Sequence, residues 1–288
     1  MFSTLTHLTK LRQKKRFSTG SGTCAPKRLK FQFIMKLRYI AISLAYDYPT
    51  SKEYRYEFEC HSRYICNFLS KAIRKYKIEV EETYNMILIT LGKEELPKVH
   101  SYSKCLQISL PFDKSWYEKV KGTEDTSYYI HVLNLGLKQA FEYSHVAHSY
   151  LESLMNEFTE ANGVNEWVHK KKVFKEIGLK VEMVCRFTTN DFKLFVRFID
   201  AKSKKLIREV LTISSYPDEI AFDFCFRDII CFDNRIWITD FQNRPYLYVD
   251  VDNLHSSELK FSYTNKFVND EDHFNLLVKN TSVDLPKD

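Results

Sequence analysis

The chain has 288 residues, of which 44% are hydrophobic and 28% are charged, a composition typical of a globular protein that excludes a largely disordered one. Its 7 glycines leave little material for phosphate-binding loops, whereas 22 Phe, 18 Tyr and 3 Trp favour β-strands and buried aromatic packing. The formal net charge is +6, which by itself would suggest a nucleic-acid partner.

This positive charge comes from the first 34 residues. They include no Asp or Glu, and their basic residues are Lys10, Arg12, Lys14, Lys15, Arg16, Lys27, Arg28 and Lys30. From Met35 onward acidic residues slightly outnumber basic ones, so nucleic acid is not an expected partner of the folded body.

We expect residues 1–34 to be an unstructured basic leader, and its composition allows different interpretations. It resembles a mitochondrial targeting segment, or the true start is Met35, where MKLRYIAISLAY opens a strand. A disordered nucleic-acid-binding arm is the third interpretation. We therefore expect a cytoplasmic protein, or a mitochondrial one if the leader is a transit peptide.

Solubility and an intracellular location are expected on two further grounds. No apolar run approaches the roughly 18 residues that a membrane span needs, so membrane insertion is not expected. The 7 cysteines are odd in number and scattered, which argues against a disulfide framework and favours a reducing compartment.

Residues 35–163 are expected to form an α+β subdomain. Its predicted core is a ββαββ unit, because alternating apolar positions give way to helical spacing and then alternate again. Two helices should follow, the second of them long and ended by Asn162-Gly163. The expected strands are 37–46, 53–61, 83–91 and 104–110, and the expected helices are 65–76, 113–121 and 126–161.

Residues 164–288 are expected to form a mainly antiparallel β subdomain. A helix over 165–177 should come first, with Asn165 as its N-cap and Gly178 after its end. Short turn-rich connections leave no room for crossover helices, so the strands that follow should form an antiparallel meander, with a poorly ordered tail after about 265. The predicted fold class is α+β, and the expected strands are 179–189, 192–199, 205–213, 219–227, 229–239 and 245–251.

The motifs of common reaction centres are absent from the sequence: it has no GxSxG, GxxxxGK[ST], GxGxxG, HExxH or CxxC. A set of His and Glu residues at helical spacing is interpreted as a solvated helix face, since its members lie opposite the apolar stripe. We assign no catalytic residue, metal ligand or cofactor. The set comprises His131, Glu142, His145, His148 and Glu152.

An alternative function is a metal-dependent hydrolase or nuclease that uses Asp and Lys residues of the C-terminal sheet. Asp200 and Lys202 resemble the acid and lysine that nucleases of the PD-(D/E)xK type place on one strand, but Asp218 then follows in the wrong order. A hairpin turn explains these residues without catalysis. The carboxylates of Asp240, Asp250 and Asp252 complete this candidate set.

The favoured interpretation is an interaction protein that binds a protein partner through an aromatic and acidic sheet surface. Aromatic side chains supply rigid contact area, and carboxylates complement a basic partner. The combination is similar to that of many bacterial immunity proteins, which implies an inhibitor, although no motif of such a family is matched. Phe222, Phe224 and Phe226 are expected to be mainly core, and the predicted binding residues are Trp237, Asp240, Tyr246, Tyr248, Asp250 and Asp252.

Overall fold

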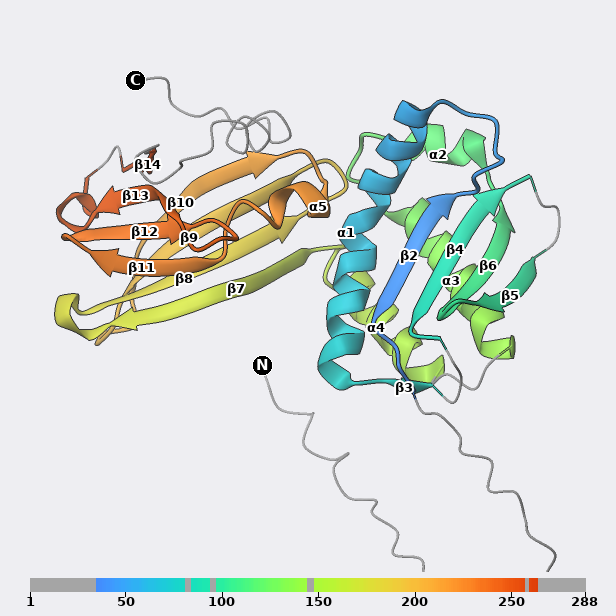
Figure 1. Cartoon of the computed structure of the whole chain (residues 1–288), viewed down its shortest axis with the longest axis horizontal. Helices are drawn as coiled ribbons and strands as arrows, with labels where there is room; N and C mark the ends of the chain where they lie inside the picture. Colours follow the sequence, from blue (N-terminus) through green and yellow to red (C-terminus); the bar gives the residue numbers. More distant parts are fainter. Residues whose placement is uncertain (1–34, 81–83, 94–96, 144–147, 257–258, 264–288) are drawn as a thin grey trace, which may run out of the picture. The chain divides into compact units, whose positions relative to one another are not determined.

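The computed structural model describes residues 35–80, 84–93, 97–143, 148–256 and 259–263, which all belong to one compact unit. The expected leader (1–34) and the tail after 265 lie outside these residues, as does His145. The α+β class is confirmed, with helices beside an N-terminal sheet and antiparallel sheets in the C-terminal part (Figure 1). The division expected near Gly163 stays a prediction.

The N-terminal sheet has four strands in the order β2-β4-β6-β5, of which β2, β4 and β6 are parallel and β5 is antiparallel to β6. Helix α1 lies along β2 and helices α3 and α4 lie behind the sheet (Figure 1). Short strands β1 and β3 pair with each other. The bounds are β1 Met35–Lys36, β2 Tyr39–Leu44, α1 Lys52–Tyr76, β3 Glu79–Val80, β4 Met86–Gly92, β5 Lys98–Tyr102, β6 Cys105–Pro111, α2 Lys114–Val120, α3 Ser127–Tyr143 and α4 His148–Glu160.

The free edge of β2 is covered by small polar side chains of α1. The hydroxyl of Ser70 accepts from the backbone N–H of Ile40 at 3.0 Å, and Ser62 donates to the carbonyl of Ile42 at 3.5 Å. An uncovered edge would present unpaired backbone groups to other chains, so this helix both packs on the sheet and closes its edge.

The segment expected to be the second strand, 53–61, is instead the first half of α1, so the predicted ββαββ order is not the observed one. Ser51 caps the helix by accepting from the backbone N–H of Tyr54, and Glu53 lies in the first turn. The alternation at Tyr54, Tyr56 and Phe58 favours a strand, but burial follows the helical spacing, with Phe58 fully buried and Tyr56 46% exposed.

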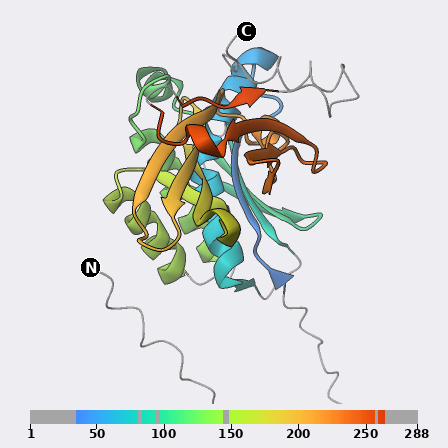
Figure 2. The same cartoon turned by 90° about the vertical axis from the view of Figure 1, so that its left-hand side faces the viewer.

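The C-terminal part contains two antiparallel four-stranded sheets, in the orders β10-β9-β8-β7 and β11-β12-β13-β14. Their buried faces contribute to one hydrophobic core, which includes Phe198 of β9, Ile236 of β12 and Leu247 of β13. Figure 2 shows the same two sheets after a quarter turn. The antiparallel meander is confirmed, with bounds β7 Asn165–Phe174, β8 Leu179–Phe187, β9 Phe192–Asp200, β10 Leu206–Ser215, α5 Glu219–Phe222, β11 Asp228–Phe232, β12 Arg235–Thr239, β13 Pro245–Asp250 and β14 Ser262–Tyr263.

Elements in this part differ from the expectation in three places. The expected strand 229–239 is the hairpin of β11 and β12, which turns at Asp233-Asn234. The predicted helix 165–177 is strand β7, followed by a short 3-10 turn that ends at Gly178 with φ +63°. Its lysine-rich middle offers no apolar helical stripe, and pairing with β8 prevails over the capping signals. The predicted strand 219–227 is helix α5 and turns, through which Phe222 and Phe226 both reach the core and stack on Phe192.

The region expected to be one helix over 126–161 is described as α3 and α4, with residues 144–147 outside the description. Helix α3 contacts the sheet closely at Gly136, where an added Cβ would lie 2.4 Å from Cδ1 of Ile89 on β4. Glycine is therefore required for this approach. In the described parts of the chain, no helix is long and apolar enough to cross a membrane.

Candidate binding surface

The outward face of the sheet β11–β14 carries an aromatic patch, which we define as Phe232, Trp237 and Tyr248. Trp237 lies on β12, with the ring of Phe232 from β11 stacked at 4.9 Å and the ring of Tyr248 from β13 at 4.7 Å between centroids. Its indole N–H donates to the carbonyl of Phe232 at 3.4 Å. The patch is thus held by ring stacking and by its own backbone.

Strand alternation explains why these rings face outward. In β12, Ile236 and Ile238 are fully buried on the inner face, so Arg235 and Trp237 point to the other side. Trp237 is nevertheless only 4% exposed, because its neighbours on both sides shield it, while Phe232 remains 42% exposed. Phe232 is therefore the accessible edge of the patch.

Charged groups surround one end of the patch. The guanidinium of Arg235 lies 4.6 Å from the ring centroid of Tyr248, and its Nε donates to Oδ1 of Asp250 at 2.7 Å. This hydrogen bond raises the pKa of Arg235, which is charged in any case. Asp252 accepts from the amide of Asn234 at 2.8 Å, and Asp233 occupies the adjacent β11–β12 turn. Carboxylates outnumber guanidinium groups here, so the local charge is negative.

The structure brings together only part of the predicted binding set. Trp237, Tyr248, Asp250 and Asp252 lie at this one corner of the sheet, whereas Asp240 and Tyr246 have structural roles. Asp240 is 2% exposed and accepts from Arg244 Nε at 2.7 Å and from backbone N–H groups of its own turn.

Tyr246 is held in place by a backbone contact. Its hydroxyl donates to the carbonyl of Cys225, and burial raises its pKa well above the usual range. Sequence alternation places Tyr246 on the same face as Tyr248, but the register shift between Ile238 and Thr239 changes the pairing at this end of β13.

The carboxylates of the alternative function each have hydrogen-bond or ion-pair partners within the protein. Asp200 accepts from the backbone of its own turn, at Lys202 and Ser203, and Asp218 is paired with Arg63 and accepts from the hydroxyl of Tyr56. No group of three His, Cys, Asp or Glu side chains is placed to hold a metal ion within the ranges that the structure covers. His131, from the helix-face set, is exposed on α3.

A polar seam between α1 and the C-terminal part is a feature that the sequence does not reveal. Lys71 donates to Oδ1 of Asn165 at 3.0 Å, and the amide of Asn165 donates to the carbonyl of Tyr64 at 2.6 Å and to Asn67 at 3.1 Å. Burial lowers the pKa of Lys71 to about 7. The spacing of Arg63, Asn67 and Lys71 on one side of α1 is a signal, but a solvated helix face gives the same pattern.

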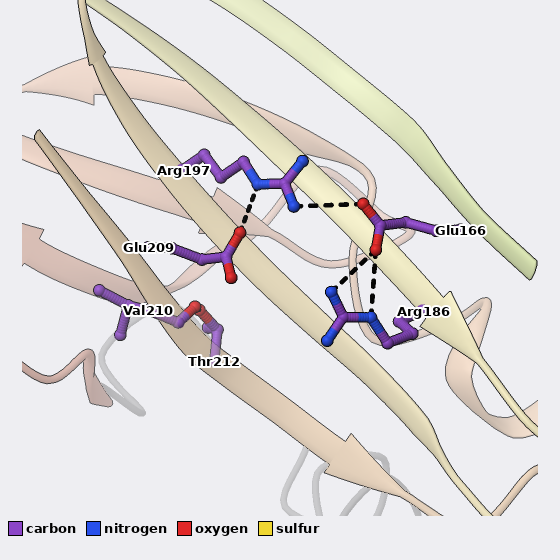
Figure 3. A network of polar contacts seen from close by, with 6 residues as sticks. All are labelled: Glu166, Arg186, Arg197, Glu209, Val210 and Thr212. Carbon is purple, nitrogen blue, oxygen red and sulfur yellow. Dashed lines mark hydrogen bonds and ion pairs between the residues drawn. The ribbon is translucent and has the colours of Figure 1, made fainter. Parts of the chain in front are cut away.

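The outward face of the other sheet differs in chemistry. Figure 3 shows Glu166 between two arginines: Arg186 donates to it at 2.8 Å and 3.1 Å, and Arg197 at 3.1 Å. Arg197 also contacts Glu209. Opposite charges therefore neutralise one another on this face, unlike at the aromatic patch.

Comparison with known proteins gives no relative from which a function can be transferred. A scan against protein-family models, a search of curated proteins and a search of solved structures each return no match for the chain.

Proposed function

We propose that this protein binds a protein partner through the aromatic patch, and that the docking segment of the partner is basic. The observation that carries the proposal is the stack of Phe232, Trp237 and Tyr248 on an outward sheet face, beside a surplus of carboxylates.

The arrangement of rings suits an interface anchor. Aromatic residues are enriched at interfaces, and here the buried ring of Trp237 holds the exposed ring of Phe232 in place for a partner. The stacking fixes the rings before a partner arrives, so less ordering entropy opposes binding. Phe232, at 42% exposure, supplies apolar area that a partner can cover.

The charges suggest the chemistry of the partner. Asp233, Asp250 and Asp252 lie near one another in the pairing of β11, β12 and β13, with Arg235 as the compensating cation. A lysine or arginine of the partner can sit against the exposed ring of Phe232 and pair with these carboxylates, which adds cation–π attraction to the Coulomb term. An inhibitor of the immunity type would use such a surface to cover its partner, and that role is the narrower form of the proposal.

Selection of peptides from a random displayed library tests the proposal even though the partner is unidentified. The wild-type chain should enrich peptides with Lys or Arg next to an apolar residue. Phe232→Ser should weaken their binding about tenfold or more, as loss of an interface anchor does. Charge reversal by Asp252→Lys should weaken the same peptides and reduce the salt dependence of their binding.

Leu211→Ser provides the matched control, because Leu211 is 49% exposed on the outward face of the other sheet. Peptides that bind this variant and the wild type equally well, but bind Phe232→Ser weakly, support the proposal. Enrichment of acidic peptides, or equal loss in both serine variants, contradicts it.

A further inference from the structure

The N-terminal sheet has a second face, opposite the one that its core residues occupy and separate from the aromatic patch. The buried face carries residues such as Ile40, Ile89 and Ile108, while the alternating residues point to the other side. Strand pairing arranges the latter in cross-strand rows without any Asp or Glu. The rows are Tyr39, Met86, Cys105 and Tyr102; then Ala41, Leu88, Gln107 and His100; then Ser43, Thr90, Ser109 and Lys98.

This face is hollowed at the carboxyl ends of the parallel strands. The floor of the hollow consists of Thr90, Gln107 and Ser109, which offer hydroxyl and amide groups. Lys93 and His100 line it as well, together with the loop from Ala45 to Asp47 that follows β2. The carboxyl ends of parallel strands are where open α/β sheets bind ligands, because the connecting loops diverge there.

The wall formed by the loop after β2 is rigidly held. The guanidinium of Arg55 donates to the carbonyls of Leu44 at 2.7 Å, Ala45 at 2.6 Å and Tyr46 at 3.1 Å. On the other side Gly92 approaches so closely that an added Cβ would lie 3.0 Å from Cβ of Ala45. This wall of the hollow is therefore preorganised, which favours binding because little ordering is needed there.

We propose that this hollow binds a small phosphate monoester that carries hydroxyl groups, such as a sugar phosphate. Lys93 supplies positive charge for the phosphate, and the ring of His100 supplies a further N–H donor. Thr90, Gln107 and Ser109 hydrogen-bond the hydroxyl groups of the ligand. Among the described lining residues Asp47 is the carboxylate, and it accepts from the hydroxyl groups of the sugar.

Calorimetric titration with ribose 5-phosphate, ribose, inorganic phosphate and AMP tests this site on the full chain. Ribose 5-phosphate should bind saturably with a Kd of about 1 mM or below, and more tightly than ribose or inorganic phosphate alone. Lys93→Met and Ser109→Ala should each weaken it about tenfold. Tighter binding of AMP assigns the ligand to the nucleotides, and weaker or equal binding assigns it to the sugar phosphates.

Matched controls separate the site from general charge effects. Lys104→Met removes a lysine of the β5–β6 turn. Ser101→Ala removes a serine of β5 that pairs with the buried Leu106, so Ser101 does not belong to the rows that form the hollow. Both should bind ribose 5-phosphate as the wild type does. The proposal is overturned if no probe binds saturably, or if Lys104→Met weakens binding as much as Lys93→Met. The peptide selection on Phe232 is unaffected by either outcome.

Discussion

Replacement of Gly136 by alanine should destabilise the protein, although alanine is the better helix former. Gly136 lies in α3 directly over β4, and an alanine Cβ there would meet Cδ1, Cγ1 and Cγ2 of Ile89 at 2.4, 2.6 and 3.2 Å. Carbon atoms in contact normally lie about 3.5 to 4.0 Å apart, so the helix and the strand must separate or Ile89 must leave its rotamer.

The magnitude follows from two opposing contributions. Overpacking of this kind costs about 1–3 kcal/mol, whereas the exchange of glycine for alanine in a helix favours folding by about 1 kcal/mol. We expect Gly136→Ala to lower the free energy of unfolding by about 1 kcal/mol in the wild-type background. In the Ile89→Ala background the obstruction is gone, so the same exchange should stabilise the protein by about 1 kcal/mol.

Urea unfolding followed by circular dichroism on the wild type, both single variants and the double variant measures this coupling. Asn134→Ala, at an exposed position of the same helix, is the control and should change stability by less than about 0.5 kcal/mol. The reasoning is refuted if Gly136→Ala has the same effect in both backgrounds, since the helix would then not pack on Ile89.

Further predictions concern the polar seam, the ion pairs of Glu166 and the buried thiols. Asn165→Ala should destabilise the protein by about 2–3 kcal/mol in urea unfolding, because the side-chain oxygen of Asn67 loses its donor and the buried ammonium of Lys71 loses its acceptor, whereas Asn190→Ala in a turn should have little effect. The pKa of Lys71 is about 7 in the folded protein against 10.5 for an ordinary lysine, so the unfolded chain binds more protons between these pH values. The stability of the wild type relative to Lys71→Met should therefore rise from pH 7 to about pH 10, and a fall would contradict the burial of this amine. Glu166→Gln should cost at most about 1 kcal/mol, and the loss should shrink in 1 M NaCl, as judged from thermal unfolding. Burial raises the pKa of four thiols, those of Cys60, Cys66, Cys185 and Cys225. Iodoacetamide at pH 7.5 should therefore modify these thiols only after the protein is unfolded in urea. Rapid labelling of the native protein, measured by mass spectrometry, would disprove their burial.

The C-terminal meander is predictable because its signals are local. Turn residues separate runs with period 2, and each short connection permits only an antiparallel partner. The turn at Asp233-Asn234 shows this well, since both residues adopt positive φ between β11 and β12. The cross-strand pair of Trp237 on β12 and Tyr248 on β13 is consistent with the same alternation.

The start of α1 could not be predicted, because two periodicities compete there. Tyr54, Tyr56 and Phe58 satisfy a strand pattern, and only packing against the sheet decides that Phe58 is buried with the helical positions. Strand β7 escapes prediction for the converse reason, since Asn165 and Gly178 imitate helix ends while pairing with β8 fixes the strand.

The polar seam is beyond sequence reasoning. Lys71 and Asn165 are far apart in the chain, and a polar helix position gives no sign of the buried partner that it will meet. The hollow beside Ser109 is also a tertiary feature, because it depends on rows formed by four strands. In both cases the individual residues look like ordinary surface residues until the sheet order is known.

Site-specific photo-crosslinking in the native cell tests the proposed function most directly. The photoreactive residue p-benzoylphenylalanine is placed at Phe232 in one strain and at Leu211, with similar exposure on the other sheet, in a second strain. The proposal predicts one discrete protein adduct from position 232 that is absent at position 211 and is lost when Asp252→Lys is added, with the crosslinked peptide of the partner rich in Lys or Arg. The same adduct from both positions, or a discrete adduct only from position 211, would contradict binding through the aromatic patch.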